Sequence, residues 1–228
     1  MNDKIEVKNI SKSFTIGEKN LEVLRGLYLT VSHAEMIAIT GVSGVGKSTL
    51  LHLLGTLDIP SSGEVLYDEV NPFLLSTHDL SQFRNRTIGF IFQAHHLLPE
   101  FTACENVMIP LLINRYSRKE AREKADSFLA EVELDHRKNH KPGELSGGEQ
   151  QRVAVARSLV NNPKVIIADE PTGNLDEKTG RSIHNLLKRI NKEHGITFII
   201  ATHNLRLASE TDQQYQLIDG ILIDDNNH

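Results

Sequence analysis

The stretch Gly41-Val42-Ser43-Gly44-Val45-Gly46-Lys47-Ser48 decides the fold, because it matches the phosphate-binding loop G-x-x-x-x-G-K-[ST]. Its glycines let consecutive backbone N–H groups turn toward an anion, while Lys47 adds a positive charge and Ser48 a hydroxyl for Mg2+. The apolar run 36–40 has the length of a strand, and residues 48–54 carry apolar side chains at helical spacing. We therefore predict a strand, a phosphate loop and a helix whose N-terminus faces the phosphates.

A pair of acids follows a second apolar run. Val165 to Ala168 has the pattern of a buried strand, and Asp169 and Glu170 come directly after it. Ligands of parallel sheets bind at the carboxyl ends of the strands, so we expect these carboxylates beside the phosphate loop. Neighbouring side chains of a strand point opposite ways, which predicts different roles: one acid for the metal and one to polarise water. The alternative is a pair of solvated acids before Pro171.

A second turn suited to an anion lies in Leu145-Ser146-Gly147-Gly148-Glu149. It opens a segment whose apolar positions 153, 155, 156, 159 and 160 have helical spacing, so its N–H groups also face outward from a helix N-terminus. A second phosphate-facing turn in one chain suggests that two chains share each nucleotide. Together the three motifs predict ATP hydrolysis.

The order of these motifs resembles the nucleotide-binding domain of ABC transporters, over nearly the whole chain. The resemblance implies an α/β fold with a P-loop NTPase core on a mainly parallel sheet, an antiparallel β lobe and an inserted α-helical lobe. We expect a single ABC ATPase domain over 1–228. Its β lobe would be 1–35 and 60–75, its nucleotide-binding core 36–59, 86–93 and 160–228, and its helical lobe, with the signature turn, 94–159.

The resemblance also implies ATP and Mg2+ as cofactors and gives individual residues their roles. Glu170 would be the general base, His203 and Lys47 would contact the γ-phosphate, and Gln93 would reach the metal and the attacking water. Ser48, Gln93 and Asp169 would serve Mg2+. Asp176 lies in the segment 174–176 that matches the loop crossing the dimer. The residues implied to contact ATP are Phe14, Gly41, Val42, Ser43, Gly44, Val45, Gly46, Lys47, Ser48, Thr49, Ser146, Gly147, Gly148 and Asp176.

Some of these positions have simpler alternatives or depart from the family. Phe14 matches the aromatic residue that stacks on adenine, but a Phe is usually buried in a core. Glu149 stands where the family usually has Gln, and a carboxylate near a polyphosphate should repel it unless it points to the ribose or to solvent. His95 and His96 do not predict a metal site, because adjacent histidines diverge and no Cys or acid cluster completes the ligands.

Composition limits the class of protein. The chain has 228 residues, a net charge of −5 and a pI near 6.1, which argues against a nucleic-acid-binding surface. Its one cysteine, Cys104, makes no internal disulfide, which favours a reducing compartment. Residues 1–5 lack the apolar core of a signal peptide, and no apolar run approaches the length of a transmembrane helix. We therefore expect no direct membrane insertion, and the resemblance implies a peripheral place on the cytoplasmic face of the inner membrane.

Segment 95–112 bears on the partners. In the family this segment contacts the coupling helix of the membrane subunit, and here it resembles the ATP-binding subunits of lipoprotein-releasing systems. The resemblance implies membrane permease subunits as partners and a homodimer in the ATP-bound state. Leu97, Leu98 and Phe101 are the expected contact residues. The alternatives are a macrolide-exporter-like ATPase and a cell-division ATPase that regulates a cell-wall hydrolase. A soluble DNA-repair or translation role is weaker, because the chain has one set of motifs.

Overall fold

Residues 4–17 and 19–224 are described by the computed structural model, so residues 1–3, 18 and 225–228 of the expected domain lie outside the described residues. Three strands form an antiparallel sheet in the order β2-β1-β4. Their bounds are β1 (Lys4–Ile16), β2 (Lys19–Ser32) and β4 (Ser62–Tyr67). Buried and exposed residues alternate along the second half of β2, as expected for a sheet with one face in the core. The predicted antiparallel β lobe is confirmed.

A six-stranded sheet carries the nucleotide-binding motifs. Its order is β5-β6-β7-β3-β8-β9, and every neighbouring pair is parallel except β8 with β9. The strands are β3 (Met36–Thr40), β5 (Ile88–Phe92), β6 (Val165–Asp169), β7 (Thr197–Ala201), β8 (Gln213–Ile218) and β9 (Ile221–Asp224). All residues of β3 and β7 are buried, because both faces of this sheet are covered. The predicted mainly parallel sheet is confirmed.

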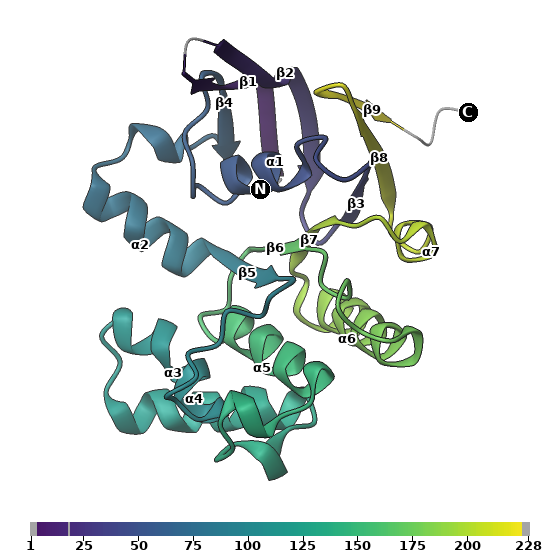
Figure 1. Cartoon of the computed structure of the whole chain (residues 1–228). Helices are drawn as coiled ribbons and strands as arrows, with labels where there is room; N and C mark the ends of the chain where they lie inside the picture. The colour runs from purple at the N-terminus through teal and green to yellow at the C-terminus, as the bar shows by residue number, and fades with distance from the viewer. Residues whose placement is uncertain (1–3, 18, 225–228) are drawn as a thin grey trace.

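The two faces of the parallel sheet belong to two hydrophobic cores. On β6, Val165 and Ile167 pack in the core shared with the antiparallel sheet and with α1 (Lys47–Leu54). Ile166 and Ala168, the alternate residues, pack in the core shared with the helical segments. This alternation follows from the two-residue period of a strand. Figure 1 shows the arrangement, with the antiparallel strands above the parallel sheet and most helices below it.

Three helices dominate the segment between β5 and β6. They are α3 (Ala103–Ile113), α4 (Arg118–Glu131) and α5 (Gly147–Leu159), and the short 3-10 turns η2 (Asp135–Arg137) and η3 (Pro142–Glu144) lie between α4 and α5. The spacing of Ser117 and Glu120 in the sequence predicts a capping box, and this box opens α4. The three helices gather at the end of the molecule farthest from the antiparallel sheet (Figure 1). The expected helical lobe is therefore built from these elements.

Two helices differ from the sequence expectation. Residues 180–194 have the sequence pattern of an amphipathic helix. The structure has α6 (Glu177–His194), which begins three residues earlier because the Asp176 side chain accepts a hydrogen bond from the N–H of Thr179 and caps it. Helix α2 (Thr77–Thr87) was not expected. Each of its residues is at least partly exposed, so it has no hydrophobic periodicity to read. The remaining short elements are η1 (Pro72–Leu74) and α7 (Leu205–Ala208).

A buried amide fixes the loop between β5 and α3. Asn106 is fully buried, and its side chain accepts from the N–H of Leu98 and donates to the carbonyls of Leu98, Phe101 and Thr102. These bonds satisfy the polar loop backbone that packs against α3.

Within the described residues, no helix combines the length and apolar character needed to cross a membrane.

Candidate nucleotide-binding site

A cavity of about 660 Å³ lies at the carboxyl ends of the parallel strands. Four chain segments meet there, as expected for an open parallel sheet. The phosphate loop follows β3, Gln93 follows β5, the acid pair ends β6, and His203 follows β7. The lining residues are Val23, Ser43, Gly44, Gly46, Lys47, Ser48, Thr49, Gln93, Asp169, Glu170 and His203. The structure thus brings together the predicted phosphate-loop, metal and catalytic residues.

Two glycines of the loop are required by its backbone. Gly46 has φ 112° and Gly41 has φ 147°, both in the region that side chains disfavour. A Cβ on Gly46 would lie 2.8 Å from the side chain of Val23, and one on Gly41 would lie 2.7 Å from the carbonyl oxygen of Leu217. The loop therefore holds its shape through close contacts that leave no room for side chains.

The Lys47 ammonium group is already hydrogen-bonded within the loop. Its Nζ donates to the carbonyl oxygens of Gly41 at 2.8 Å and Val42 at 3.1 Å, and the residue is only 8% exposed. Val45 packs its side chain against the core, whereas Val42 is exposed. Neither valine side chain lines the cavity, so these two predicted residues would contribute backbone groups.

Glu170 leaves the strand in an unusual conformation. Its φ is 46°, in the left-handed region, and its N–H donates to the carbonyl of Ala201 on β7. The carboxylate is held by His203, whose Nδ1 lies 2.9 Å from Oε1 and whose backbone N–H donates to Oε2 at 3.3 Å. Asp169, the last residue of β6, lines the same cavity. The two acids therefore share one cavity while differing in backbone geometry and partners.

Gln93 is paired with the loop that follows the acid pair. Its Nε2 donates to Oδ1 of Asn174 at 3.0 Å, and Nδ2 of Asn174 donates to the Gln93 carbonyl at 3.1 Å. A Cβ on Gly173 would lie 2.9 Å from Nε2 of Gln93. The reciprocal pair links the segment after β5 to segment 174–176. Sequence reasoning missed it, since the partners are distant in the chain.

The signature turn and Phe14 lie outside the lining of this cavity. Ser146 caps α5, and Gly148 packs so closely that a Cβ would lie 2.5 Å from the Thr179 side chain of α6. Gly147 is the first residue of α5, and Asp176 caps the start of α6. In a single chain, the structure therefore separates Ser146, Gly147, Gly148 and Asp176 from the phosphate loop.

Phe14 is a surface residue of β1. Its side chain is 39% exposed, and the ammonium group of Lys12 lies 4.9 Å from the ring centroid. The alternative that Phe14 is a buried core residue is therefore wrong. An exposed aromatic face beside a cation is available to a planar ligand.

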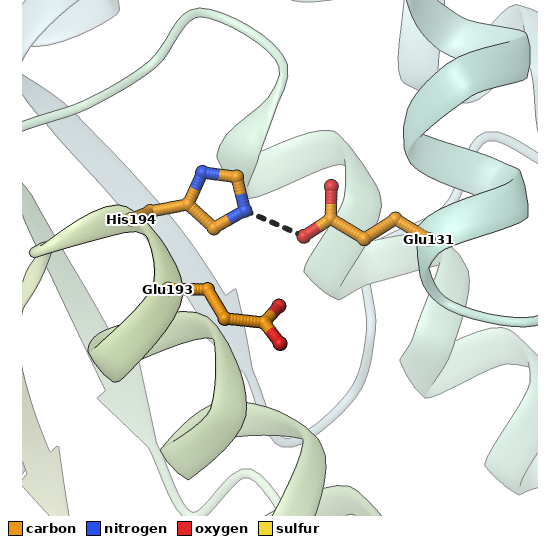
Figure 2. Close-up of side chains that lie close together, drawn as sticks. All are labelled: Glu131, Glu193 and His194. Atoms are coloured by element: carbon orange, nitrogen blue, oxygen red, sulfur yellow. Dashed lines mark hydrogen bonds and ion pairs between the residues drawn. The ribbon is translucent and has the colours of Figure 1, made fainter.

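Two further polar features lie elsewhere. A groove of about 680 Å³ at α5 and α6 is lined by four cationic and two acidic side chains, and both acids are paired, Glu133 with Arg152 and Glu177 with Arg181. Figure 2 shows Glu131 at the end of α4 facing Glu193 and His194 at the end of α6, with Nε2 of His194 2.7 Å from Glu131 Oε1. Their ligand atoms lie within 4.8 Å of one another, and Glu193 and His194 are exposed. We interpret this group as a hydrogen-bonded contact between the two helices.

His95 and His96 belong to a different local structure. Both have positive φ, and the guanidinium of Arg157 donates to both of their carbonyl oxygens at 2.6 Å. Nδ1 of His95 lies 2.5 Å from Oε1 of Gln151, and burial lowers the pKa of His95. These contacts give the histidine pair a structural role after Gln93.

Of the lining residues, Val23 was missed by the sequence analysis. It lies on β2, far from the loop in sequence, and contacts the loop at Gly46. Val23 stands between Leu21 and Leu24 in the sequence, so it has the pattern of an apolar strand residue and gives no local signal for a binding site. Its contact with Gly46, at the start of α1, brings it to the cavity.

Comparisons with known proteins agree with this geometry. A family model described as "ABC transporter" matches residues 24–173. A protein of Geobacter metallireducens named "Lipoprotein-releasing system ATP-binding protein LolD" is 52% identical over 225 residues, covering 99% of this chain and 100% of that protein. A Myxococcus xanthus protein of the same name is 49% identical and covers 95% of this chain and 96% of its own length. A solved dimeric ATP-binding cassette, bound to ADP and Pi in a post-hydrolysis state, has a TM-score of 0.88 and 42% identity and covers 96% of each chain.

Proposed function

This chain belongs to the ABC transporter family, and on that premise we propose that it is the ATP-hydrolysing subunit of a complex that releases lipoproteins from the inner membrane toward the outer membrane. Hydrolysis of ATP coupled to transport is the activity of the family. The lipoprotein cargo is supported by the names of relatives that match over nearly the whole chain. Those names do not favour the macrolide-exporter or cell-division alternatives.

The observation that carries the proposal is the cavity in which Lys47, Glu170 and His203 converge. Phosphoryl transfer asks a protein for positioning and charge stabilisation rather than covalent chemistry. We assign Lys47 to the phosphates, where its ammonium group would leave the loop carbonyls for phosphate oxygens. Glu170 would accept a proton from the attacking water, and His203, already 2.9 Å from Glu170, would hold that carboxylate and orient the γ-phosphate.

The donor set of the cavity fits Mg2+. Ser48, Gln93 and Asp169 offer a hydroxyl, an amide and a carboxylate oxygen, the ligand types that a hard divalent cation prefers. We propose that these three residues hold it, together with the phosphates of ATP. When bound, Mg2+ would neutralise negative charge on the phosphate oxygens of ATP.

The separation of the two phosphate-facing turns supports a homodimer in the ATP-bound state. One chain would offer the phosphate loop, and its partner would offer Ser146, Gly147 and Gly148 to the same γ-phosphate, with Asp176 near the dimer contact. Phe14 would stack on the adenine. A solved relative of this fold is described as a dimer bound to ADP and Pi.

A cleft near Gln93 supports docking of membrane permease subunits of the lipoprotein-releasing type. The cleft has a volume of about 410 Å³ and lies between α2, α3 and the segment after β5. Its walls include Phe92, His96, Pro110 and Ile113. We propose that a helix of the permease binds there and places this chain, as a peripheral subunit, on the cytoplasmic face of the inner membrane. Leu98 and Phe101, each about two-fifths exposed, would extend the contact.

Reconstitution tests the proposed function. The chain and its co-purified membrane subunits are placed in liposomes carrying a fluorescent lipoprotein and given Mg-ATP with a soluble acceptor. We expect ATP-dependent transfer of the lipoprotein to the acceptor, abolished by Lys47→Ala. ATP hydrolysis without lipoprotein transfer, in the presence of the co-purified subunits, would contradict the cargo while leaving the ATPase assignment intact.

A further inference from the structure

The Glu149 carboxylate, expected to point to the ribose or to solvent, is instead tied to the signature serine. Oε2 accepts hydrogen bonds from both the N–H and the hydroxyl of Ser146, each at 2.8 Å. In return, the N–H of Glu149 donates to Oγ of Ser146 at 3.3 Å. This arrangement is a capping box. The N–H and the hydroxyl of Ser146, the two donors that could bind a phosphate, are therefore both bonded to the Glu149 carboxylate.

The second carboxylate oxygen belongs to an arginine. Nε of Arg137 in η2 lies 3.0 Å from Oε1 of Glu149, and the two side chains are 39% and 24% exposed. The guanidinium is held on its other side, where NH1 lies 3.2 Å from Nε2 of His140. The hydrogen bonds from Ser146, and then the charge of Arg137, hold the pKa of Glu149 below its usual value. Glu149 is therefore an ionised carboxylate, and the guanidinium of Arg137 lies against one of its two oxygens.

This geometry matters when a γ-phosphate approaches Ser146. The hydroxyl must leave Oε2 to donate to a phosphate oxygen, and the carboxylate must then lie beside a second negative group. An uncompensated carboxylate would both retain the hydroxyl and repel the phosphate. The Arg137 guanidinium opposes both effects, because it stabilises the negative charge of the Glu149 carboxylate once the Ser146 hydroxyl donates to the phosphate instead.

We propose that Arg137 is a positioning residue for the signature turn: by pairing with Glu149 it allows Ser146 to exchange a carboxylate for the γ-phosphate of the partner's ATP. The inference rests on the proposed function, in which Ser146 completes the nucleotide site across the dimer. Arg137 acts through Glu149 and touches no substrate. Its effect on the dimer should therefore vanish when residue 149 carries no charge.

A double-mutant cycle in a Glu170→Gln background tests this. The measurement is the concentration of Mg-ATP at which half of the protein is dimeric, by light scattering. An exposed ion pair changes an equilibrium constant by up to about fivefold, and the dimer contains the turn twice, so Arg137→Gln should weaken dimerisation by about tenfold. The double variant Arg137→Gln with Glu149→Gln should dimerise within about twofold of the Glu170→Gln parent. Arg137→Lys should keep most of the parent's dimerisation.

Two controls separate this role from a loss of folding. ATP binding by the monomer, measured in the same Glu170→Gln background, should be equal in all variants, because Arg137, Ser146 and Glu149 lie outside the lining of the nucleotide cavity. The defect of Arg137→Gln should also shrink at high salt, since it is electrostatic. A defect that persists in the Glu149→Gln background would overturn the inference and mark Arg137 as a structural residue. Full dimerisation of Arg137→Gln would also overturn it. Failure of the Glu170→Gln parent to dimerise would overturn the proposed dimer, and with it this inference.

Discussion

Nδ1 of His203 lies 2.9 Å from Oε1 of Glu170, across the carboxyl ends of two neighbouring parallel strands. The backbone N–H of His203 reaches the other oxygen of the same carboxylate. Glu170 is held in this contact by a left-handed φ of 46° and by its own N–H bond to β7. The proposed base and its orienting residue are therefore in contact before a substrate enters, and an attacking water would have to share the carboxylate with His203.

Glu170→Gln should bind Mg-ATP nearly normally and hydrolyse it at least about a hundredfold more slowly. The amide keeps the shape of the side chain but loses the basic oxygen, and a positioned base contributes about 10² to 10⁴ in rate. Phosphate release under saturating ATP measures the effect. Glu177→Gln, which removes an exposed carboxylate at the start of α6, is the matched control and should keep the parent rate. Near-parental turnover by Glu170→Gln would assign the base to another residue.

Phe14→Ala should lower nucleotide affinity by about 1 to 3 kcal/mol, the range for stacking of a base on an aromatic side chain. Because the ring is 39% exposed, the melting temperature without nucleotide should change little. Titration with a fluorescent ATP analogue and thermal melting give the two quantities. Tyr28→Ala removes a 65% exposed ring from the neighbouring strand β2 and should leave affinity unchanged. Unchanged affinity in Phe14→Ala would remove this residue from the nucleotide site.

The stability of the protein should fall in acid as its capping boxes are protonated. Hydrogen bonds from Thr102 lower the pKa of Glu105, and those from Ser117 lower the pKa of Glu120, both from 4.5. Because the folded pKa is depressed, each carboxylate contributes stability that is complete above about pH 4.5 and is lost as pH falls through the lowered value. Urea unfolding at steps from pH 6 to pH 3 should show this decline.

Glu120→Gln isolates one cap in that experiment. Glutamine also closes a capping box but does not titrate, so the unfolding free energy of the variant should depend less steeply on pH below about 4.5. Glu123→Gln, in the same helix but outside the cap, is the control. An equal pH dependence in parent and Glu120→Gln would show that the cap is not among the groups responsible.

The sequence predicted those parts of the fold whose signal is local. Residues 41–48 could be placed because the loop chemistry needs that order of residues, and the apolar runs 36–40 and 165–168 predicted the buried strands β3 and β6. Helix α2 could not be predicted, because none of its residues is buried; it begins at the Ser76 cap and packs on the core through the partly buried Phe83, whose ring contacts Tyr67. A long-range pair such as Gln93 with Asn174 also has no local signal.

Glu149 is a different case, because its place in a capping box could be predicted from the sequence. Ser146 and Glu149 have the same S-x-x-E spacing as Ser117 and Glu120, where a capping box was predicted and is confirmed. The expectation that Glu149 points to the ribose or to solvent is wrong, because the same spacing forms a capping box at 146–149 as well. Only the partner Arg137, which comes from a separate turn, needed the structure.

Exposed apolar side chains beside the cleft near Gln93 form the proposed contact with the membrane subunit. Ile113 is 67% exposed and lines the cleft near Gln93, and Leu98 is 42% exposed on the loop fixed by Asn106. Exposed apolar side chains grouped beside a cleft mark a partner surface. Leu97, the third residue of the expected apolar contact, is partly buried and packs against the helical core, so Ile113 replaces it as a test position. Ile113→Asp and Leu98→Asp should each abolish co-purification with the permease subunits.

Neither change should alter ATP hydrolysis by the free protein, because both residues lie outside the lining of the nucleotide cavity. Ile221→Asp places the same charge at a residue that is 51% exposed on β9, in the other lobe of the molecule, and should leave the complex intact. The comparison therefore separates a specific contact from a general effect of a surface charge. An aspartate desolvated against an apolar partner helix is strongly unfavourable, so the loss should be near complete rather than graded. Normal assembly of both Ile113→Asp and Leu98→Asp would place the permease contact on another face of the chain.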